Sequence, residues 1–278
     1  MGQERAVSGD PPRQRPRFPA GLQPAAAAAE RRPQPLRPQR PLAEAARDAQ
    51  RRTAPTGLGL DTAAVRQRMI VRLRADGISC APVLQAMSHV PRHVFVDSAL
   101  AAQAYEDTSL PIGLGQTISK PSVVARMLEW LMLGDTARAQ GHLGRVLEVG
   151  TGCGYQTAVL CALATSVVSV ERLLALHELA CRHLSHFQLP VPCTLVAGDG
   201  MLGHAEAGPF DSIIAAAGGE DIPLAWMEQL AVGGRIVAPA RAPNGLGQVL
   251  IVVDRLKDGW RRTVGEAVQF VPLKSGVA

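Results

Sequence analysis

The stretch Arg145-Val-Leu-Glu-Val-Gly-Thr-Gly-Cys-Gly-Tyr155 decides the fold of this chain. An apolar run ends in glycines at alternate positions, a helix-compatible segment follows, and a second apolar run over 167–170 closes on Glu171. Strand, glycine-rich turn, helix and strand in this order predict the first βαβ unit of a nucleotide-binding sheet. Glycines permit a sharp turn and let a ligand lie against the main chain, because no Cβ intervenes. An acid at the tip of the second strand can accept hydrogen bonds from both hydroxyls of a ribose.

The glycine spacing separates this loop from the dinucleotide-binding pattern. That pattern needs G-x-G-x-x-G, and counting from either of the first two glycines places a tyrosine or a threonine where the third belongs. The pattern present, Glu148-x-Gly150-x-Gly152-x-Gly154, resembles the loop of S-adenosyl-L-methionine-dependent methyltransferases, whose cofactor has no pyrophosphate to hold. A glycine-rich turn that only joins a strand to a helix is the alternative, and Glu171 at the strand tip argues against it.

The first 60 residues differ in composition from the rest of the 278-residue chain. They contain 10 of the 21 prolines, and 11 arginines against five acids give them a net charge of +6, which leaves −1 for residues 61–278. Such a segment buries too little apolar surface to offset its ordering entropy, so we predict a disordered extension over 1–60. Residues 61–278 are expected to form one domain, with a helical and substrate-loop region over 61–134 and a cofactor-binding core over 145–278.

Several classes of partner are not expected. The extension lacks aromatic interleaving, so we expect no nucleic-acid binding, and no segment is apolar enough for a membrane span. The five cysteines form no C-x-x-C pair, which predicts reduced thiols and a cytoplasmic location. Cys181, His183 and His186 match no established ligand spacing, so we expect no metal site. We expect a monomer.

Apolar periodicity places the remaining elements. Helices are expected from 61 to 77, from 79 to 90, over 99–105, from Pro121, and over 155–164, 173–187 and 223–230. Strands are expected over 145–149, 166–171, 193–198, 211–216, 235–239, 248–254 and 261–271. Strands that alternate with helices predict an α/β fold with a doubly wound, mostly parallel sheet. The last two strands flank Asp258-Gly259 and predict a C-terminal antiparallel hairpin, and the first helices form an N-terminal helical subregion.

A second informative stretch, Leu110-Pro-Ile-Gly-Leu-Gly-Gln-Thr-Ile-Ser-Lys-Pro121, precedes the glycine-rich unit. Together with Val90-Pro91-Arg92, Gly198-Asp199-Gly200 and Phe270-Val271-Pro272-Leu273, it resembles the protein-L-isoaspartate O-methyltransferase family over residues 65–276. The resemblance implies a Rossmann-like methyltransferase that esterifies the free α-carboxylate of L-isoaspartyl residues in damaged peptides and proteins. The ester then closes to a succinimide, and hydrolysis returns part of it to aspartate.

The chemistry of that step agrees with what the sequence offers. An α-carboxylate has a pKa of about 3.5 and is already ionised at neutral pH, so no general base is needed. The opposite charges of carboxylate and sulfonium disappear in the displacement, and a dry site therefore does not penalise the transition state. Catalysis then depends chiefly on holding oxygen, methyl carbon and sulfur in line, which can contribute about 7–11 kcal/mol.

By this resemblance Ser119 is the catalytic residue, and its hydroxyl donates to the acceptor carboxylate. An alternative role is the N-cap of the helix that starts at Pro121, because serine is a preferred cap. Gln116 either bonds substrate backbone or braces its own loop, and Thr117 is expected chiefly to order the loop. The substrate-binding residues implied are Gln116, Thr117, Ile118, Val271 and Pro272, with the main chain around Val271 pairing with the peptide.

The resemblance also assigns the cofactor side. Glu171 binds the ribose hydroxyls, with a solvated strand end as the alternative. Asp199 accepts from the adenine amino group, unless it is an ordinary turn aspartate. Glu148 lies inside a strand, where an unpaired charge is costly, so we expect it to bond loop amides and, through them or a water, the cofactor. The cofactor-binding residues are then Glu148, Gly150, Thr151, Gly152, Gly154, Glu171, Asp199 and Gly200.

Two positions depart from the family pattern. Lys120 stands where many relatives have glutamine, and Gln269 stands where many bacterial relatives have arginine. These changes leave the sequence-context preference around isoaspartate open. Two alternative functions also stay open, namely a methyltransferase of the same fold with a small-molecule acceptor, and a noncatalytic paralogue that binds cofactor or damaged chains.

Overall fold

The computed structural model describes residues 63–278. The predicted extension over 1–60 and the expected helix start at Asp61 lie outside the described residues. The helices are α2 (Ala63–Ala75), α3 (Ala81–His89), α4 (Pro121–Met132), α5 (Asp135–Gln140), α6 (Tyr155–Cys161), α7 (Leu174–Leu184) and α8 (Leu224–Gln229), with 3-10 turns η1 (Arg92–Phe95), η2 (Ser98–Gln103), η3 (Gly200–Leu202) and η4 (Ala205–Ala207).

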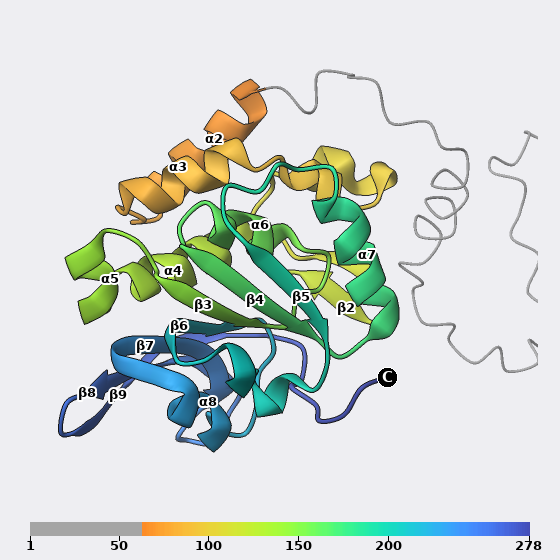
Figure 1. Ribbon diagram of the computed structural model, residues 1–278. Helices are drawn as coiled ribbons and strands as arrows, with labels where there is room; N and C mark the ends of the chain where they lie inside the picture. The colour runs from red at the N-terminus through yellow and green to blue at the C-terminus, as the bar shows by residue number, and fades with distance from the viewer. Residues whose placement is uncertain (1–62) are drawn as a thin grey trace, which may run out of the picture. The chain divides into compact units, whose positions relative to one another are not determined.

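Two sheets are formed by the strands of this part of the chain. The strands are β1 (Leu110–Gly113), β2 (Gln116–Ile118), β3 (Arg145–Val149), β4 (Ser166–Glu171), β5 (Cys193–Ala197), β6 (Phe210–Ala215), β7 (Leu230–Arg241), β8 (Gln248–Leu256) and β9 (Gly259–Val268). β1 and β2 pair as a small antiparallel hairpin, and the other seven follow the order β5-β4-β3-β6-β7-β8-β9 (Figure 1).

The large sheet confirms the predicted fold class. Its first five strands in spatial order, β5 to β7, pair in parallel, and β8 and β9 add an antiparallel hairpin at one edge. The chain builds β4 and β5 on one side of β3 and then returns to place β6 on the other side. The crevice at the carboxyl ends of β3 and β6 is therefore the switch point at which such sheets bind ligands.

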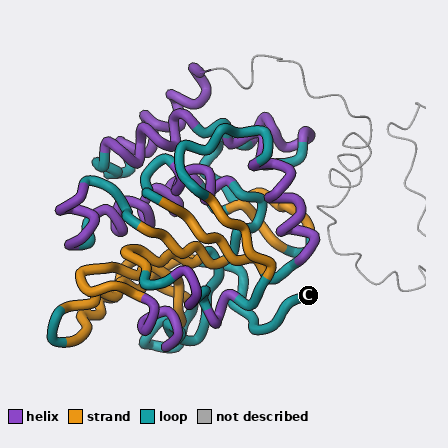
Figure 2. Tube along the Cα trace, viewed as in Figure 1, coloured by secondary structure: helices purple, strands orange, loops and turns teal. Residues whose placement is uncertain are grey.

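The alternation of side chains along β3 divides the core into two layers. Val146 belongs to the larger cluster, which is built with α2 to α6, whereas Leu147 belongs to the cluster that contains Trp226 of α8. Figure 1 and Figure 2 show α8 on the opposite side of the sheet from α4 and α6. Both faces of the parallel part are covered, and this agrees with the near-continuous apolar character of its strands.

Some elements differ from the sequence-based expectation. The stretch Leu110–Ile118 folds as a hairpin, and the short polar helix α5 was not predicted. The helix expected over 99–105 is the 3-10 turn η2, where Asp97 caps the start by accepting from the Ala99 amide at 3.0 Å. β7 begins at Leu230 rather than 235. β9 ends at Val268 rather than 271, because the Val271 carbonyl pairs outside the β8 ladder. Within residues 63–278 no helix is long and apolar enough to cross a membrane.

Candidate functional site

A cavity of about 340 Å³, called the central cavity, lies at the carboxyl ends of the parallel strands. Its walls come from the loop after β3, the end of β4, the start of η3 and the residues after β6, and the β1–β2 hairpin and the segment after β9 complete it. Most sequence-predicted site residues line this cavity: Gln116, Thr117, Ile118, Ser119, Gly150, Thr151, Gly152, Glu171, Gly200, Val271 and Pro272.

The loop after β3 presents main chain to the cavity, and it requires glycine to do so. Gly150 and Gly152 have φ angles of 90° and 57°, which other L-residues adopt only at a cost. A Cβ on Gly152 would lie 3.2 Å from Cδ1 of Ile112, which reaches in from β1. Gly154 precedes α6 with a φ of 91° and does not line the cavity, and a Cβ there would press on Leu184 of α7.

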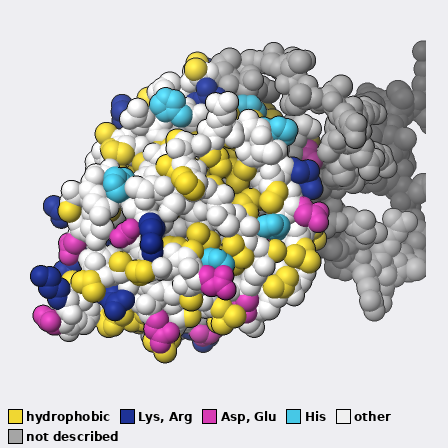
Figure 3. Space-filling view, in the orientation of Figure 1, with side chains coloured by type: hydrophobic (Ala, Val, Ile, Leu, Met, Phe, Trp, Pro, Cys, Tyr) yellow, Lys and Arg dark blue, Asp and Glu magenta, His cyan; other side chains and the backbone are white. Residues whose placement is uncertain are grey.

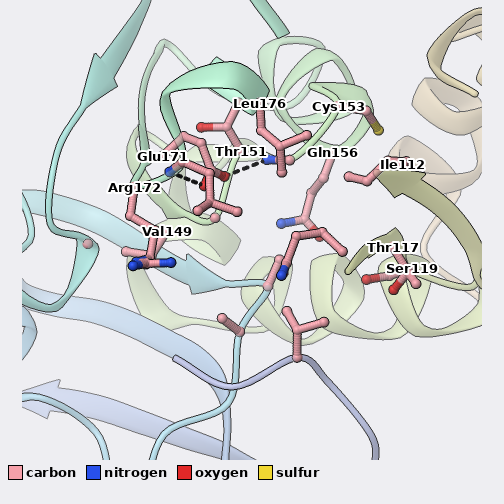
Figure 4. A pocket seen from close by; sticks show the side chains of 18 of the residues that line it. Ile112, Thr117, Ser119, Val149, Thr151, Cys153, Gln156, Glu171, Arg172 and Leu176 are labelled. Atoms are coloured by element: carbon pink, nitrogen blue, oxygen red, sulfur yellow. Dashed lines mark hydrogen bonds between the residues drawn. The ribbon is translucent and has the colours of Figure 1, made fainter. Parts of the chain in front are cut away.

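Glu171 ends β4 with its carboxylate held against the glycine loop (Figure 4). Its Oε2 accepts from the Gly152 amide at 2.9 Å, and its Oε1 accepts from the Leu173 amide at 3.0 Å. The residue is only 5% exposed and lines the central cavity. Each carboxylate oxygen can accept more than one hydrogen bond, so Glu171 keeps the capacity to accept from ligand hydroxyls.

Glu148 lies behind the glycine loop and does not line the cavity. It is fully buried, and its carboxylate accepts from Gln156 Nε2 at 3.0 Å, from Ser169 Oγ at 2.7 Å and from the Thr157 hydroxyl. The expectation of loop amides as partners is wrong, because the side chain faces α6 and β4, which supply polar side chains instead. Burial raises the pKa of Glu148 to about 7, and the three hydrogen bonds oppose that rise.

Asp199 stands beside the central cavity without lining it. Its Oδ1 accepts from the Met201 amide at 2.9 Å and caps η3, and its Oδ2 accepts from the Gly276 amide at 2.7 Å. The carboxylate therefore ties the C-terminal segment to the wall of the cavity. The neighbouring Gly200 does line the cavity, and a Cβ there would collide with Val149 Cγ1 at 2.4 Å. The bond from Asp199 to an adenine amino group stays a prediction.

The β1–β2 hairpin carries two hydroxyls into the site. Thr117 lies in β2 and Ser119 follows it, and Figure 4 shows their hydroxyls close together across the cavity from Glu171. Gln116 Nε2 donates to the Leu114 carbonyl at 3.3 Å and so braces its own loop, which was one of its two expected roles. The capping alternative for Ser119 is wrong, because the N-cap of α4 is Lys120, and the side chain that accepts from a first-turn amide of that helix is Asp107, through the Ser122 amide.

Arg92 places a buried positive charge behind Ser119, and its role was not predicted from the sequence. Arg92 is 0% exposed; its Nε donates to the Ala104 carbonyl at 2.7 Å, and its Nη2 donates to the Ser119 carbonyl at 2.7 Å. The guanidinium also lies over the Tyr155 ring, 4.8 Å from the centroid. Nη1 has no hydrogen-bond partner, and burial lowers the pKa of Arg92. In the sequence, the signal that could have indicated this role is the presence of Arg92 within the largely apolar stretch 90–96.

A second hollow, called the lateral groove, adjoins the central cavity. Four residues belong to both hollows, namely Thr117, Ser119, Ala216 and Val271. The two hydroxyls therefore stand where the cavity opens into the groove. The groove is lined by Thr108, Ser109, Thr117, Ser119, Lys120, Val123, Ala216, Ala267, Val268, Gln269, Phe270 and Val271.

The segment after β9 is tied to the body of the fold by its main chain. The Val271 carbonyl accepts from the Gly218 amide at 2.9 Å, and the Leu273 amide donates to the Gly218 carbonyl at 2.9 Å. Gly218 therefore occupies the Val271 carbonyl and the Leu273 amide, and pairing of the other main-chain groups around Val271 with a peptide stays a prediction. Val271 and Pro272 still line the central cavity with their side chains and remaining backbone.

The ionisable groups near the hydroxyls are poor bases and poor nucleophiles. Burial raises the pKa of Cys153 to about 11 and that of Tyr155 to about 12, so both stay protonated at neutral pH. No histidine is among the described residues that line either hollow. Within residues 63–278 no cluster of His, Cys, Asp and Glu is placed to hold a metal ion. The arrangement suits the orientation of an acceptor that is already ionised.

Comparisons with known proteins agree with this geometry. The sequence profile of the Protein-L-isoaspartate(D-aspartate) O-methyltransferase (PCMT) family matches residues 64–278. The chain is 58% identical over 242 residues to the protein-L-isoaspartate O-methyltransferase of Methylibium petroleiphilum, which covers 87% of this chain and 88% of that protein. It is also 58% identical over 247 residues to the protein of the same name from Leptothrix cholodnii, over 88% and 86% of the two chains.

Solved structures share the fold. A protein-L-isoaspartate O-methyltransferase structure superposes with a TM-score of 0.67 at 26% identity, over 77% of this chain and 67% of that chain. A beta-aspartate methyltransferase (PCMT) from Plasmodium falciparum, solved with S-adenosyl-L-homocysteine, gives a TM-score of 0.65 at 23% identity over 75% and 98% of the two chains.

Proposed function

The chain belongs to the protein-L-isoaspartate(D-aspartate) O-methyltransferase family, and from this premise we propose that it methylates the free α-carboxylate of L-isoaspartyl residues in damaged peptides and proteins. S-adenosyl-L-methionine is the methyl donor. The observation that carries the proposal is the position of the Thr117 and Ser119 hydroxyls at the opening between the central cavity and the lateral groove. A donor in the cavity and a peptide in the groove meet at this opening.

The residues of the central cavity fit the donor. Glu171 keeps free acceptor capacity for ribose hydroxyls, and the Gly150–Gly152 main chain leaves room for an amino-acid tail. Gly200 packs closely against Val149, where a Cβ would collide, and both residues line the part of the cavity in which we place the base. Glu148 acts from behind the loop, where it fixes the first turn of α6 through Gln156. When bound, S-adenosyl-L-methionine supplies an electrophilic methyl group on a positively charged sulfur.

The chain itself orients the acceptor and excludes competitors. The Ser119 hydroxyl donates to one carboxylate oxygen of the isoaspartyl residue and turns the other toward the cavity, while Thr117 orders the same loop. Arg92 donates a hydrogen bond to the Ser119 carbonyl and so fixes the backbone of the loop that carries the hydroxyl. No base is required because the carboxylate is already ionised. Cys153 is among the lining residues, but its thiol does not compete for the methyl group, since its raised pKa keeps it protonated.

A radiolabelled methyl-transfer assay tests the proposal. The full chain is incubated with labelled S-adenosyl-L-methionine and either an isoaspartyl peptide or the matched aspartyl peptide. We expect incorporation only into the isoaspartyl peptide, as a base-labile ester. Incorporation into neither peptide would sink the proposal, and equal incorporation into both would replace it with a general carboxyl methyltransferase.

We also propose that the enzyme acts as a cytoplasmic monomer. The two hydroxyls, the central cavity and the lateral groove that the proposed reaction uses are all formed by residues of a single copy. Sedimentation equilibrium should give a single species of about the mass of one chain, 29.4 kDa. A stable dimer at the protein concentration of the activity assay would contradict this expectation.

A further inference from the structure

We propose that Lys120 makes the lateral groove select isoaspartyl peptides that carry an acidic side chain next to the isoaspartyl residue. The inference rests on the proposed function and adds a substrate class to it. The observation behind it is the distribution of ionisable side chains in the groove. Among the described residues that line the groove, Lys120 is the one ionisable side chain, and the rest are hydroxyl, amide and apolar residues. A peptide in the groove therefore meets a single positive charge.

The fold does not use that charge elsewhere. Lys120 is exposed, and none of the ion pairs or side-chain hydrogen bonds formed within residues 63–278 involves its ammonium group. Two acids that interact with α4 have other partners: Asp107 accepts from the Ser122 amide and hydroxyl, both at 2.8 Å, and Glu266 pairs with Arg126 at 3.4 Å. Neither Asp107 nor Glu266 lines the groove.

Helix stability does not explain the lysine either. Lys120 is the N-cap of α4, a 12-residue helix, and it makes no side-chain cap hydrogen bond there. A cation at a helix N-terminus faces the positive end of the helix dipole, which is the unfavourable arrangement. Lysine at this position therefore carries a small cost for the fold. The Asp107 carboxylate, which accepts from the Ser122 amide in the first turn of α4, offsets the dipole of this helix end. The positive charge that the groove presents is therefore that of the Lys120 ammonium.

The position of Lys120 determines which part of a substrate the charge reaches. Ser119 precedes Lys120 and marks the place of the acceptor carboxylate, and both residues line the groove. The charge is therefore expected to reach a side chain next to the isoaspartyl residue. Gln269 lines the same groove from the segment after β9 and is uncharged. On the face shown in Figure 3, basic and acidic side chains are interspersed with uncharged ones.

The expected preference is modest because the pair is exposed to solvent. Interactions between exposed opposite charges correspond to about two- to fivefold in kcat/KM. The preference should shrink as sodium chloride is raised from low concentration to about 0.5 M, since screening shortens the reach of the ammonium charge. A neighbouring lysine in the peptide should be disfavoured by a similar factor.

The test uses one isoaspartyl hexapeptide in three versions, with Glu, Gln or Lys beside the isoaspartyl residue, and repeats the set on its other side. kcat/KM is measured for the full wild-type chain, for Lys120→Gln and for Lys257→Gln. Lys257 lies in the β8–β9 turn, away from both hollows, so its replacement controls for net charge. A double variant, Lys120→Gln with Gln269→Arg, returns a cation to the groove from the segment after β9.

We expect the order Glu, Gln, Lys for wild type and for Lys257→Gln, near-equal values for Lys120→Gln, and recovery of the order in the double variant. Equal values in wild type, or an order that survives Lys120→Gln, would overturn the inference alone. An equal loss for all peptides in Lys120→Gln would also overturn it, because the ammonium would then serve the isoaspartyl carboxylate itself. Failure to methylate any isoaspartyl peptide would overturn the proposed function and this inference with it.

Discussion

The two walls of the central cavity are built in different ways. On the glycine-loop wall, each acidic group is already held: Glu171 by two backbone amides, Asp199 by two more, and Glu148 by three side chains. On the hairpin wall, the reactive end consists of the Thr117 and Ser119 hydroxyls. Behind these hydroxyls, the Arg92 guanidinium is buried and retains an unpaired N–H.

The contrast follows from what each wall has to recognise. The methyl donor is the same in every turnover, so binding groups that are already held in place lose little conformational entropy when it binds. The acceptor carboxylate arrives in many different peptides. It is bound by small, rotatable hydroxyls on a loop whose backbone is held by Arg92. Substitutions on the hairpin wall should therefore lower kcat, and substitutions on the glycine-loop wall should weaken donor binding.

The largest expected effect belongs to the hairpin wall. Ser119→Ala should lower kcat about ten- to a hundredfold, since a hydrogen bond to a charged group contributes about 1.5–3 kcal/mol. The dissociation constant for S-adenosyl-L-homocysteine, measured by calorimetry, should be nearly unchanged. Ser119→Thr should retain partial activity because it keeps the hydroxyl but adds a methyl group.

Ser122→Ala is a matched control for this variant. It also removes a serine hydroxyl near the start of α4, but from a residue that lines neither hollow, and it should leave turnover near wild type. If Ser119→Ala kept wild-type turnover on a saturating isoaspartyl peptide, catalysis would rest on the loop backbone instead.

The glycine-loop wall should show the reverse behaviour. Glu171→Gln should weaken S-adenosyl-L-homocysteine binding about tenfold, at the lower end of the range for a charged acceptor because glutamine keeps one acceptor oxygen. At saturating donor, kcat should change little. Calorimetry gives the affinity and the methylation assay gives kcat. An unchanged dissociation constant would remove Glu171 from the donor site.

Arg92 joins the comparison as a positioning residue. Arg92→Lys keeps the charge but loses the planar fork that reaches both the Ala104 and Ser119 carbonyls, so kcat should fall about fivefold. Donor affinity should stay near wild type, whereas a general loss of folding would lower it as well. Arg92→Met should lower kcat further, and the lysine variant keeps the test open if the methionine variant does not fold. Equal losses of kcat and donor affinity in Arg92→Lys would contradict the positioning role.

The smallest expected effect is a pH dependence of stability. The pKa of Glu148 is about 7 in the folded chain against an ordinary value of 4.5, so the folded state binds more protons between these values. Stability from this group is therefore lost as pH rises from about 4.5 to 7. Relative to Glu148→Gln, the wild-type Tm should fall by a few degrees between pH 5 and 8. Parallel Tm curves for the two proteins would contradict this prediction.

Local pattern was enough for the elements that identify this protein. The βαβ unit around Gly150 is encoded within about 27 residues, and its glycines, apolar runs and strand-tip Glu171 lie close together in sequence. The assignment of Ser119 to the site came from a shorter motif, the five residues Gly115–Ser119. Short-range patterns of this kind determine secondary structure because the period of the side chains sets which face is buried.

Tertiary structure decided which polar groups are still free to meet a ligand. The Asp199 carboxylate is occupied by Gly276, 77 residues away, and the Val271 carbonyl is occupied by Gly218. Arg92 contacts the catalytic loop through the Ser119 carbonyl, 27 residues further along. The residues next to each of these groups in the sequence do not determine its hydrogen-bond partner. Packing of the chain brings the partners together, and buried polar groups must be paired. The tertiary structure therefore determines which groups are already bonded and which can still bind a ligand.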